Sequence, residues 1–172
     1  MRLNVLQRGA VIIEEAEERD GLKGALRGSL WVDVVRDLLA AGLTDEEIAE
    51  LFRERQVWSL EAQQMKSEGY PYEEILYHLA MLRAPLGDAG RALMEVGLSP
   101  ADMLRVMLPF TDGEGHWPLV QAALLDGPED ADYAEVRGVL EFFFMAEEEI
   151  LGALEVEGIQ RERVAQRLGL RD

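Results

Sequence analysis

The stretch that decides the fold reads Leu38-Leu39-Ala40-Ala41-Gly42-Leu43-Thr44-Asp45-Glu46-Glu47-Ile48-Ala49-Glu50-Leu51-Phe52. The apolar run before Gly42 is typical of a helix that ends at this glycine, because glycine adopts the left-handed C′ conformation without a side-chain penalty. Leu43 can then pack back on the end of that helix. Thr44 and Glu47 have the spacing of a capping box, so a second helix is predicted to begin directly after the turn.

The same pattern, a glycine that ends one helix and is followed by the start of the next, recurs at Gly69, Gly97 and Gly158. The first three glycines are 27 and 28 residues apart, and the last follows after 61. Apolar residues stand at positions +1, +6 and +10 after each glycine, namely Leu43, Ile48 and Phe52, then Tyr70, Ile75 and Leu79, then Leu98, Met103 and Met107, and last Ile159, Val164 and Leu168. We interpret this as recurring helix-turn-helix hairpins. The alternative is the ordinary reuse of a common helix ending, since the spacing matches no familiar helical repeat.

Length and composition indicate a folded chain with a real core. It has 172 residues, 48% of them hydrophobic, and no cysteine, so disulfides and thiolate chemistry are excluded. No apolar run is long enough to span a membrane, and the N-terminus does not have the layout of a signal peptide. We therefore expect a cytoplasmic protein. Arginine greatly outnumbers lysine and Asn4 is the single asparagine, which is typical of a heat-adapted or GC-rich source.

The charge of the chain is strongly negative and unevenly placed. The net charge is −17, and residues 106–160 hold thirteen acids against one base, Arg137, which gives −12. The residues after 160 are basic, with arginines at 161, 163, 167 and 171. Such a charge opposes general binding to nucleic acid, which depends on neutralising phosphates. It favours an acidic surface that docks on a basic partner.

The patterns together predict an all-α protein in which about seven or eight helices form an irregular, possibly repeat-like bundle. We expect a single domain over residues 1–172. Within it, residues 1–28 are a candidate N-terminal appendage, 29–109 form helical hairpins, 129–157 form a long central helix, and 158–172 form a C-terminal helix.

The 129–157 segment has apolar residues in steps of three and four, the spacing of a heptad seam. Its row runs through Tyr133, Val136, Leu140, Phe143, Ile150 and Leu154, and Glu147 interrupts it. One interpretation makes this helix the central strut of the domain. The other makes residues 133–154 the seam of a homodimer.

Residues 44–67 resemble a DNA-reading helix-turn-helix motif in outline. The second helix offers Gln56, Ser59, Gln63, Gln64 and Lys66, which are plausible partners for base edges. Val57, Trp58, Leu60 and Met65 in the same helix need burial, however, and the local charge is not basic. A nucleic-acid-associated accessory or regulatory protein is therefore the alternative function rather than the leading one.

Two groups of residues have the types, but not the full pattern, of a metal site. Glu74 and His78 are one helical turn apart, whereas a di-iron bundle uses Glu-x-x-His with matching acids on other helices. Asp112, Glu114 and His116 share a loop that lacks the closing ligand of an EF-hand. No nucleophile elbow is present either. We therefore predict no catalytic residue, metal or cofactor.

The function expected from the sequence is a non-enzymatic protein–protein interaction or regulatory module with a strongly acidic surface. Its partner is expected to be a protein, docking through a basic surface. Trp117 is either an anchor of its loop on the core or a partner contact. The candidate interaction residues are Glu147, Glu148, Glu149, Trp117, Arg161, Arg163 and Arg167.

Overall fold

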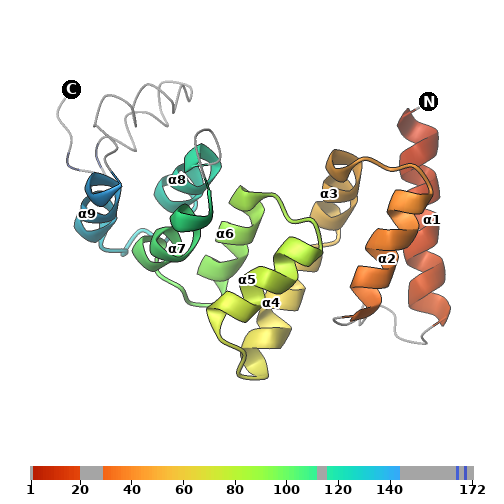
Figure 1. Ribbon diagram of the computed structural model, residues 1–172, viewed down its shortest axis with the longest axis horizontal. Helices are drawn as coiled ribbons and strands as arrows, with labels where there is room; N and C mark the ends of the chain where they lie inside the picture. The colour runs from red at the N-terminus through yellow and green to blue at the C-terminus, as the bar shows by residue number, and fades with distance from the viewer. Residues whose placement is uncertain (1, 20–28, 112–115, 144–165, 167–168, 170–172) are drawn as a thin grey trace. The chain divides into compact units, whose positions relative to one another are not determined.

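The computed structural model describes residues 2–19, 29–111, 116–143, 166 and 169. Within these residues the secondary structure is helical, with nine α-helices, one 3-10 helix and no strand, so the predicted all-α class is confirmed (Figure 1). The helix count slightly exceeds the prediction. None of the described helices is both long and apolar enough to cross a membrane.

The chain divides into two compact units, Met1–Pro85 and Leu86–Asp172, which we call unit 1 and unit 2. The single-domain prediction stays a prediction. The helices of unit 1 are α1 (Arg2–Arg19), α2 (Ser29–Ala40), α3 (Asp45–Glu54), α4 (Val57–Ser67) and α5 (Tyr72–Met81). Those of unit 2 are α6 (Leu86–Glu95), α7 (Pro100–Met107), η1 (Leu108–Phe110), α8 (His116–Leu125) and α9 (Tyr133–Phe142).

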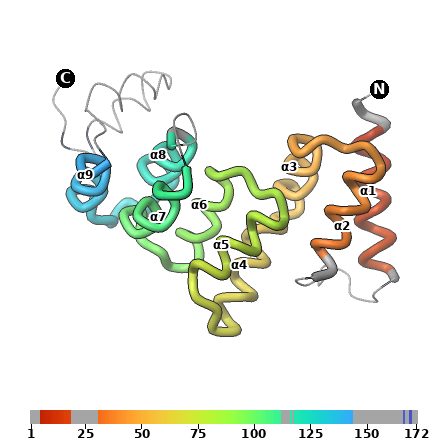
Figure 2. The backbone as a smooth tube through the Cα atoms, viewed as in Figure 1, coloured from red at the N-terminus to blue at the C-terminus, as the bar shows by residue number. Residues whose placement is uncertain are grey.

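The predicted glycine turns are present at Gly42, Gly69 and Gly97, and Figure 2 follows the backbone through them. Their φ angles are 91°, 88° and 106°, all in the left-handed region. At each turn the next residue donates its backbone N–H to a carbonyl five residues earlier, as from Leu43 to Leu38 at 3.2 Å. The glycine itself bonds three residues back, as from Gly42 to Leu39 at 3.0 Å. These paired bonds define the Schellman ending.

A fourth turn of the same kind uses Arg83 in place of glycine. The Arg83 φ is 60°, Arg83 N–H bonds to the Ala80 carbonyl at 3.0 Å, and Ala84 N–H bonds to the Leu79 carbonyl at 3.1 Å. A non-glycine residue in this conformation costs roughly 1–2 kcal/mol. Pro85 follows two residues later, where a proline commonly stands after a helix ending.

The helix starts after the turns are capped much as the sequence predicts. The Thr44 side chain accepts a hydrogen bond from the Glu47 N–H, and the Glu47 carboxylate accepts one from the Thr44 N–H at 2.9 Å. Both halves of the capping box are therefore formed. Ser99 caps α7 by accepting from the Asp102 N–H at 3.1 Å. Of the positions +1, +6 and +10 after the three glycines, all are buried except Tyr70, which is 41% exposed.

The core of unit 1 is built around aromatic rings carried by α2, α3 and α4. Phe52 is fully buried and meets Trp31 and Trp58 edge-on, with ring centroids 5.3 and 6.0 Å away. Helix α1 packs on α2 and α3. It approaches α3 closely at Gly9, where a Cβ atom would lie 2.6 Å from the Leu51 Cδ1.

Helix α8 is the buried helix of unit 2. Its residues Leu119, Val120, Ala122, Ala123 and Leu124 are all 0% exposed, and it packs against α6 and α7. The wide apolar surface of α8 faces its neighbours, and Pro118 and Gln121 are the exposed residues on its outer side. The predicted central helix at 129–157 lies only partly within the described residues, and that prediction stays a prediction.

Helix α9 is also shorter than predicted. It begins at Tyr133, after the Asp132 side chain accepts from the Glu135 N–H, and it ends at Phe142. Residues 144–157 of the predicted long helix, and the predicted C-terminal helix except for residues 166 and 169, lie outside the described residues. The first part of the heptad row faces the core of unit 2, because Tyr133, Val136 and Leu140 are buried.

Candidate functional site

Most of the predicted interaction residues lie outside the described residues. These are Glu147, Glu148, Glu149, Arg161, Arg163 and Arg167. The backbone of Trp117 lies in the first turn of α8, and its side chain is outside the described part. The structure therefore leaves these predictions as predictions.

His78, which was considered with Glu74 as a candidate metal pair, contacts a different carboxylate. The His78 Nε2 lies 3.0 Å from Oε2 of Glu61 on α4, with side-chain exposures of 14% and 6%. Glu74 is exposed. In the other candidate group, Asp112 and Glu114 are outside the described ranges, and the His116 Nε2 lies 2.9 Å from the Thr111 carbonyl oxygen. No three histidine or carboxylate side chains cluster as metal ligands would within the described residues.

The Glu61–His78 pair joins α4 to α5 inside unit 1. Glu61 is the one charged residue that is buried among those described. Nearby, Trp58 donates its indole N–H to the Leu82 carbonyl at 3.1 Å, so a second polar bond links the same helices. Burying a carboxylate is costly unless it is paired and hydrogen-bonded. The pair is therefore a packing and positioning element between two helices.

The helix-turn-helix-like segment forms two helices with a two-residue joint at Arg55 and Gln56. Gln56 itself is left-handed, with a φ of 54°. Gln63 and Lys66 are exposed on α4, whereas Ser59 and Gln64 are half-buried. The Lys66 Nζ lies 4.2 Å from the centroid of the Tyr72 ring, and Gln64 donates to the Glu68 carboxylate. Two of the candidate base-reading side chains are thus engaged within unit 1.

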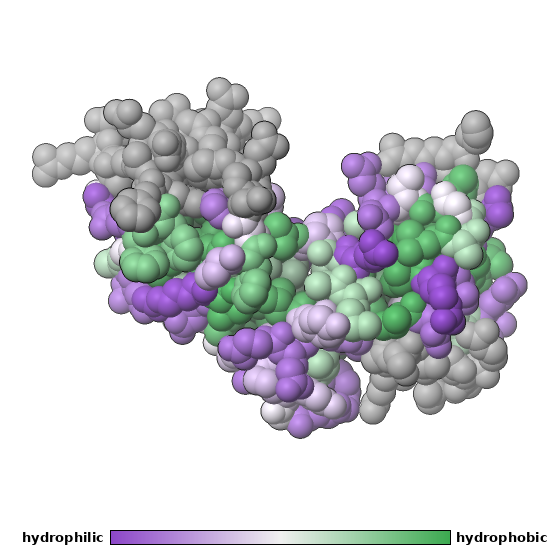
Figure 3. All heavy atoms as spheres, in the orientation of Figure 1, coloured by the Kyte–Doolittle hydropathy of each residue, from purple (hydrophilic) through white to green (hydrophobic). Residues whose placement is uncertain are grey.

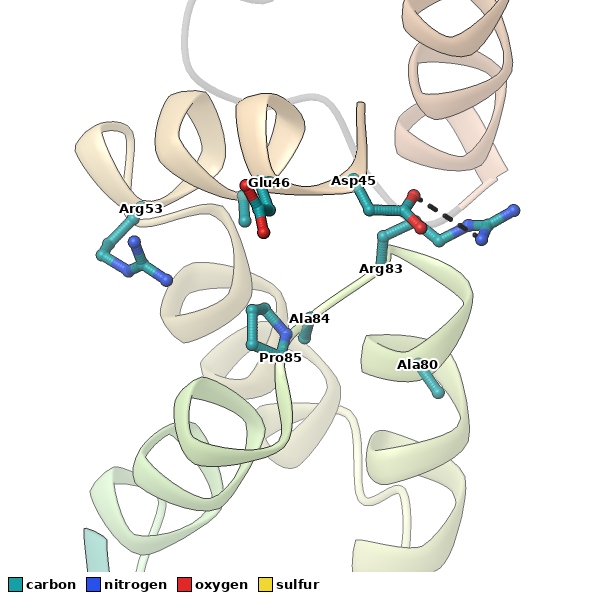
Figure 4. A pocket seen from close by; sticks show the side chains of 8 residues that line it. Asp45, Glu46, Arg53, Ala80, Arg83, Ala84 and Pro85 are labelled. Carbon is teal, nitrogen blue, oxygen red and sulfur yellow. Dashed lines mark ion pairs between the residues drawn. The ribbon is translucent and has the colours of Figure 1, made fainter. Parts of the chain in front are cut away.

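A cleft of about 490 Å³ lies between α3 and the end of α5 (Figure 4). Glu46 points from α3 toward Pro85, and Arg83 reaches the Asp45 carboxylate at 3.6 Å. Arg53 is the remaining charged residue of the lining. Two acids and two arginines leave the cleft without net charge, so its electrostatics favour no ligand of one sign.

A second hollow, of about 540 Å³, lies in unit 2 between α9 and the end of α7, and we call it the α9 groove. Its lining residues are Arg105, Pro109, Glu135, Gly138, Val139, Phe142 and Phe143. Phe142 is 76% exposed and meets Phe143 edge-on, with ring centroids 5.4 Å apart. Phe110, the last residue of η1, is 80% exposed. On the face shown in Figure 3, green apolar surface over α7 and α9 borders purple hydrophilic residues.

The charged residues at and beside the α9 groove, which we call its acidic rim, carry a net charge of −1. They are Arg105 and Glu135 of the lining and their neighbours Asp102, Arg137 and Glu141. Residues 86–111 and 116–143 hold nine acids and three arginines. Arg105 bonds to Asp102 and Glu135 at 2.7 Å each, Arg91 contacts Asp88 and Asp126, and Arg137 contacts Glu141. Every arginine in this part of unit 2 is thus held by at least one carboxylate, and the remaining charge is negative.

The pKa values of two of these arginines reflect the pairing. Hydrogen bonds that the Arg105 guanidinium donates to the Glu135 and Asp102 carboxylates raise the pKa of Arg105. Burial alone would lower the pKa of Arg91, but its hydrogen bonds to Asp88 and Asp126 outweigh that effect and raise it. Both guanidinium groups stay protonated, and they are already occupied by neighbouring acids.

The chain matches no protein-family model, no curated protein and no solved structure in the comparisons with known proteins. Any functional conclusion must therefore come from the residues themselves.

Sequence reasoning predicted the acidic character of this region but missed the α9 groove. The three consecutive phenylalanines at 142–144 do not show in the sequence which ring is exposed. The sequence contains no signal that α9 ends at Phe142, and this ending leaves the Phe142 ring exposed. Gly138 is a gap in the groove wall, since a Cβ atom there would meet no other side chain of the described residues within 4 Å.

Proposed function

We propose that the protein is a non-enzymatic interaction module that binds a partner protein carrying a basic surface. The observation that supports it best is the charge of unit 2, where nine acids face three arginines in the described ranges and each arginine is already paired. A basic partner gains attraction at long range from such a surface, which speeds association and selects the sign of the partner's charge.

Exposed aromatic side chains next to this charge also support the proposal. Phe110 and Phe142 are the two most exposed of the large hydrophobic residues in the described part of the chain. Aromatic residues are enriched in the buried centres of protein interfaces, where they supply much of the binding energy. A surface that combines an acidic rim with aromatic anchors suits protein binding.

Affinity capture of the native partner tests the proposal. The test variant replaces Glu147, Glu148 and Glu149 with glutamine, and the control makes the same change at the exposed residues Glu15, Glu18 and Glu74 of unit 1. We expect the wild-type protein and the control to retain a basic partner, and the test variant to lose most of it. Equal capture by the two variants, or a partner with an acidic surface, would contradict the proposal.

The second candidate is a nucleic-acid-associated accessory or regulatory protein that uses residues 44–67. The exposure of Gln63 and Lys66 on α4 favours it. A labelled DNA duplex should then shift in a gel at about 50 mM salt, and the shift should weaken steeply as salt rises. No shift at micromolar protein would end this candidate.

A further inference from the structure

We propose that the α9 groove binds an amphipathic helix of the partner, with bulky apolar side chains on one face and lysine or arginine residues flanking them. This rests on the proposed function and adds the place of contact and the chemical class of the bound segment. It is carried by three features of unit 2, namely an apolar hollow, a gap in its wall and an acidic rim.

The hollow is apolar where a side chain would enter it. Pro109, Val139, Phe142 and Phe143 supply its apolar lining, and Phe142 stands largely in solvent. Aromatic side chains of this kind are enriched at the centres of protein interfaces. The volume of about 540 Å³ exceeds that of one large side chain, so more than one anchor residue fits.

Gly138 lies near the middle of α9, and because it has no side chain it leaves a gap in the wall of the groove. It is exposed, and no other side chain of the described residues lies within 4 Å of the position that its Cβ would take. A bound side chain can therefore approach the backbone of α9 at this point. A larger residue at position 138 would occupy this space, and its Cβ would clash with none of the described residues.

The acidic rim favours a positively charged bound segment. Arg105 bridges Asp102 and Glu135, and all three side chains are about half exposed. Glu141 is 65% exposed and pairs with Arg137 one helical turn away. Three carboxylates, at 102, 135 and 141, thus stand beside two guanidinium groups, at 105 and 137, around the hollow. A second copy of this chain would bring the same negative rim, whereas a basic helix complements it.

The shape of the groove favours a helix over an extended strand. Its walls are the helices α7 and α9 with the short η1, and the described residues offer no strand edge to which an extended peptide could add. A common mode for a hydrophobic groove between helices is an amphipathic helix laid in it, with anchors spaced three or four residues apart.

Fluorescence anisotropy with designed peptides tests the inference on the full chain. Three labelled peptides of roughly 18 residues, several helical turns long, are compared: a lysine/leucine amphipathic helix, the same helix with glutamate for lysine, and a lysine-rich peptide without leucine. Titrations are run at about 150 mM salt, where long-range attraction is largely screened. We expect the lysine/leucine peptide to bind most tightly and the glutamate peptide not to bind.

The variant Gly138→Leu fills the gap, and Gln121→Leu on α8 is the control because it adds the same exposed side chain away from the groove. We expect Gly138→Leu to weaken binding of the lysine/leucine peptide by roughly tenfold, equivalent to the loss of one good contact, and Gln121→Leu to leave it unchanged. Circular dichroism checks that both variants remain helical.

The outcomes separate this inference from the proposed function. Equal binding of the lysine/leucine peptide to wild-type protein and Gly138→Leu overturns the groove but leaves a basic partner in place. Failure of both lysine-containing peptides to bind counts against the proposed function as well. Self-association of the chain that Gly138→Leu abolishes would assign the groove to a second copy instead, and would overturn the inference.

Discussion

At the scale of single residues, backbone conformation explains the glycines that matter most. Gly42, Gly69 and Gly97 hold the left-handed φ that lets one helix stop and the next begin, and Gly138 lies within α9, where its φ is not left-handed. The same substitution should therefore have opposite effects at the two kinds of position.

Gly42→Ala should lower the free energy of unfolding by roughly 1–2 kcal/mol, because alanine pays the cost of the left-handed conformation. Gly138→Ala should raise it by up to about 1 kcal/mol, since the helix gains a better helix former and nothing blocks the new methyl group. Urea denaturation of both variants measures the two changes. A stabilising Gly42→Ala, or equal effects of the two, would contradict the assignment of their conformations.

The buried pair of Glu61 and His78 gives a second prediction at this scale. Glu61→Ala should lower the free energy of unfolding by about 1–3 kcal/mol, because His78 loses its partner in a mostly buried place. Glu61→Gln should cost less, since an amide can still hydrogen-bond to either imidazole tautomer.

A double-mutant cycle with His78→Ala tests whether the two side chains interact directly. The two losses should then be clearly less than additive. If the losses in urea denaturation simply add, the pair contributes nothing as a unit, and α4 and α5 are held together by apolar packing alone.

At the scale of elements, the burial of α8 sets which substitutions unit 2 tolerates. Leu119→Ala should lower the free energy of unfolding by about 2–5 kcal/mol, as expected when a fully buried leucine leaves a cavity. Phe110→Ala removes a larger side chain but should change stability little, because that ring is 80% exposed. Thermal denaturation monitored by circular dichroism ranks the two, and a larger loss for Phe110→Ala would show that η1 is buried in solution.

The sequence predicted these elements well where a local signal ends a helix. Gly42 with the capping box at Thr44 and Glu47 placed the turn and the next helix start correctly. The turn at Arg83 has no glycine, and the local signal that marks this helix ending in the sequence is Pro85. Local chemistry thus determined most of the boundaries in the described part of the chain.

Prediction failed where the apolar period continued beyond the end of a helix. The apolar row from Tyr133 to Leu154 keeps its spacing through Phe143, so its spacing does not show that α9 ends at Phe142. Periodicity reports which face is buried and not where a helix stops. The candidate site was likewise predicted only in part. The charge of unit 2 can be counted from the sequence, whereas the α9 groove depends on how α9 packs against α7.

At the scale of the whole molecule, the net charge of −17 should act on both stability and binding. Like charges repel one another in the folded chain, so added salt should stabilise the fold by screening that repulsion. The midpoint of thermal unfolding should rise by a few degrees between about 20 mM and about 500 mM sodium chloride. A midpoint that falls with salt would mean that the ion pairs stabilise the fold more than the repulsion destabilises it.

The same net negative charge should make the affinity for a basic helix depend on the salt concentration. Attraction to the acidic rim is screened by salt, whereas burial of Phe142 and its neighbours in the groove gives a negative heat-capacity change that persists at high salt. The two parts of the proposed interface can therefore be separated in one set of titrations.

Isothermal titration calorimetry of the full chain with the lysine/leucine peptide, at two salt concentrations and two temperatures, tests this account most directly. We predict an affinity that falls as salt rises, together with a negative heat-capacity change that Gly138→Leu makes smaller. Absence of binding at either salt concentration, or binding that neither salt nor the filled groove alters, would contradict it.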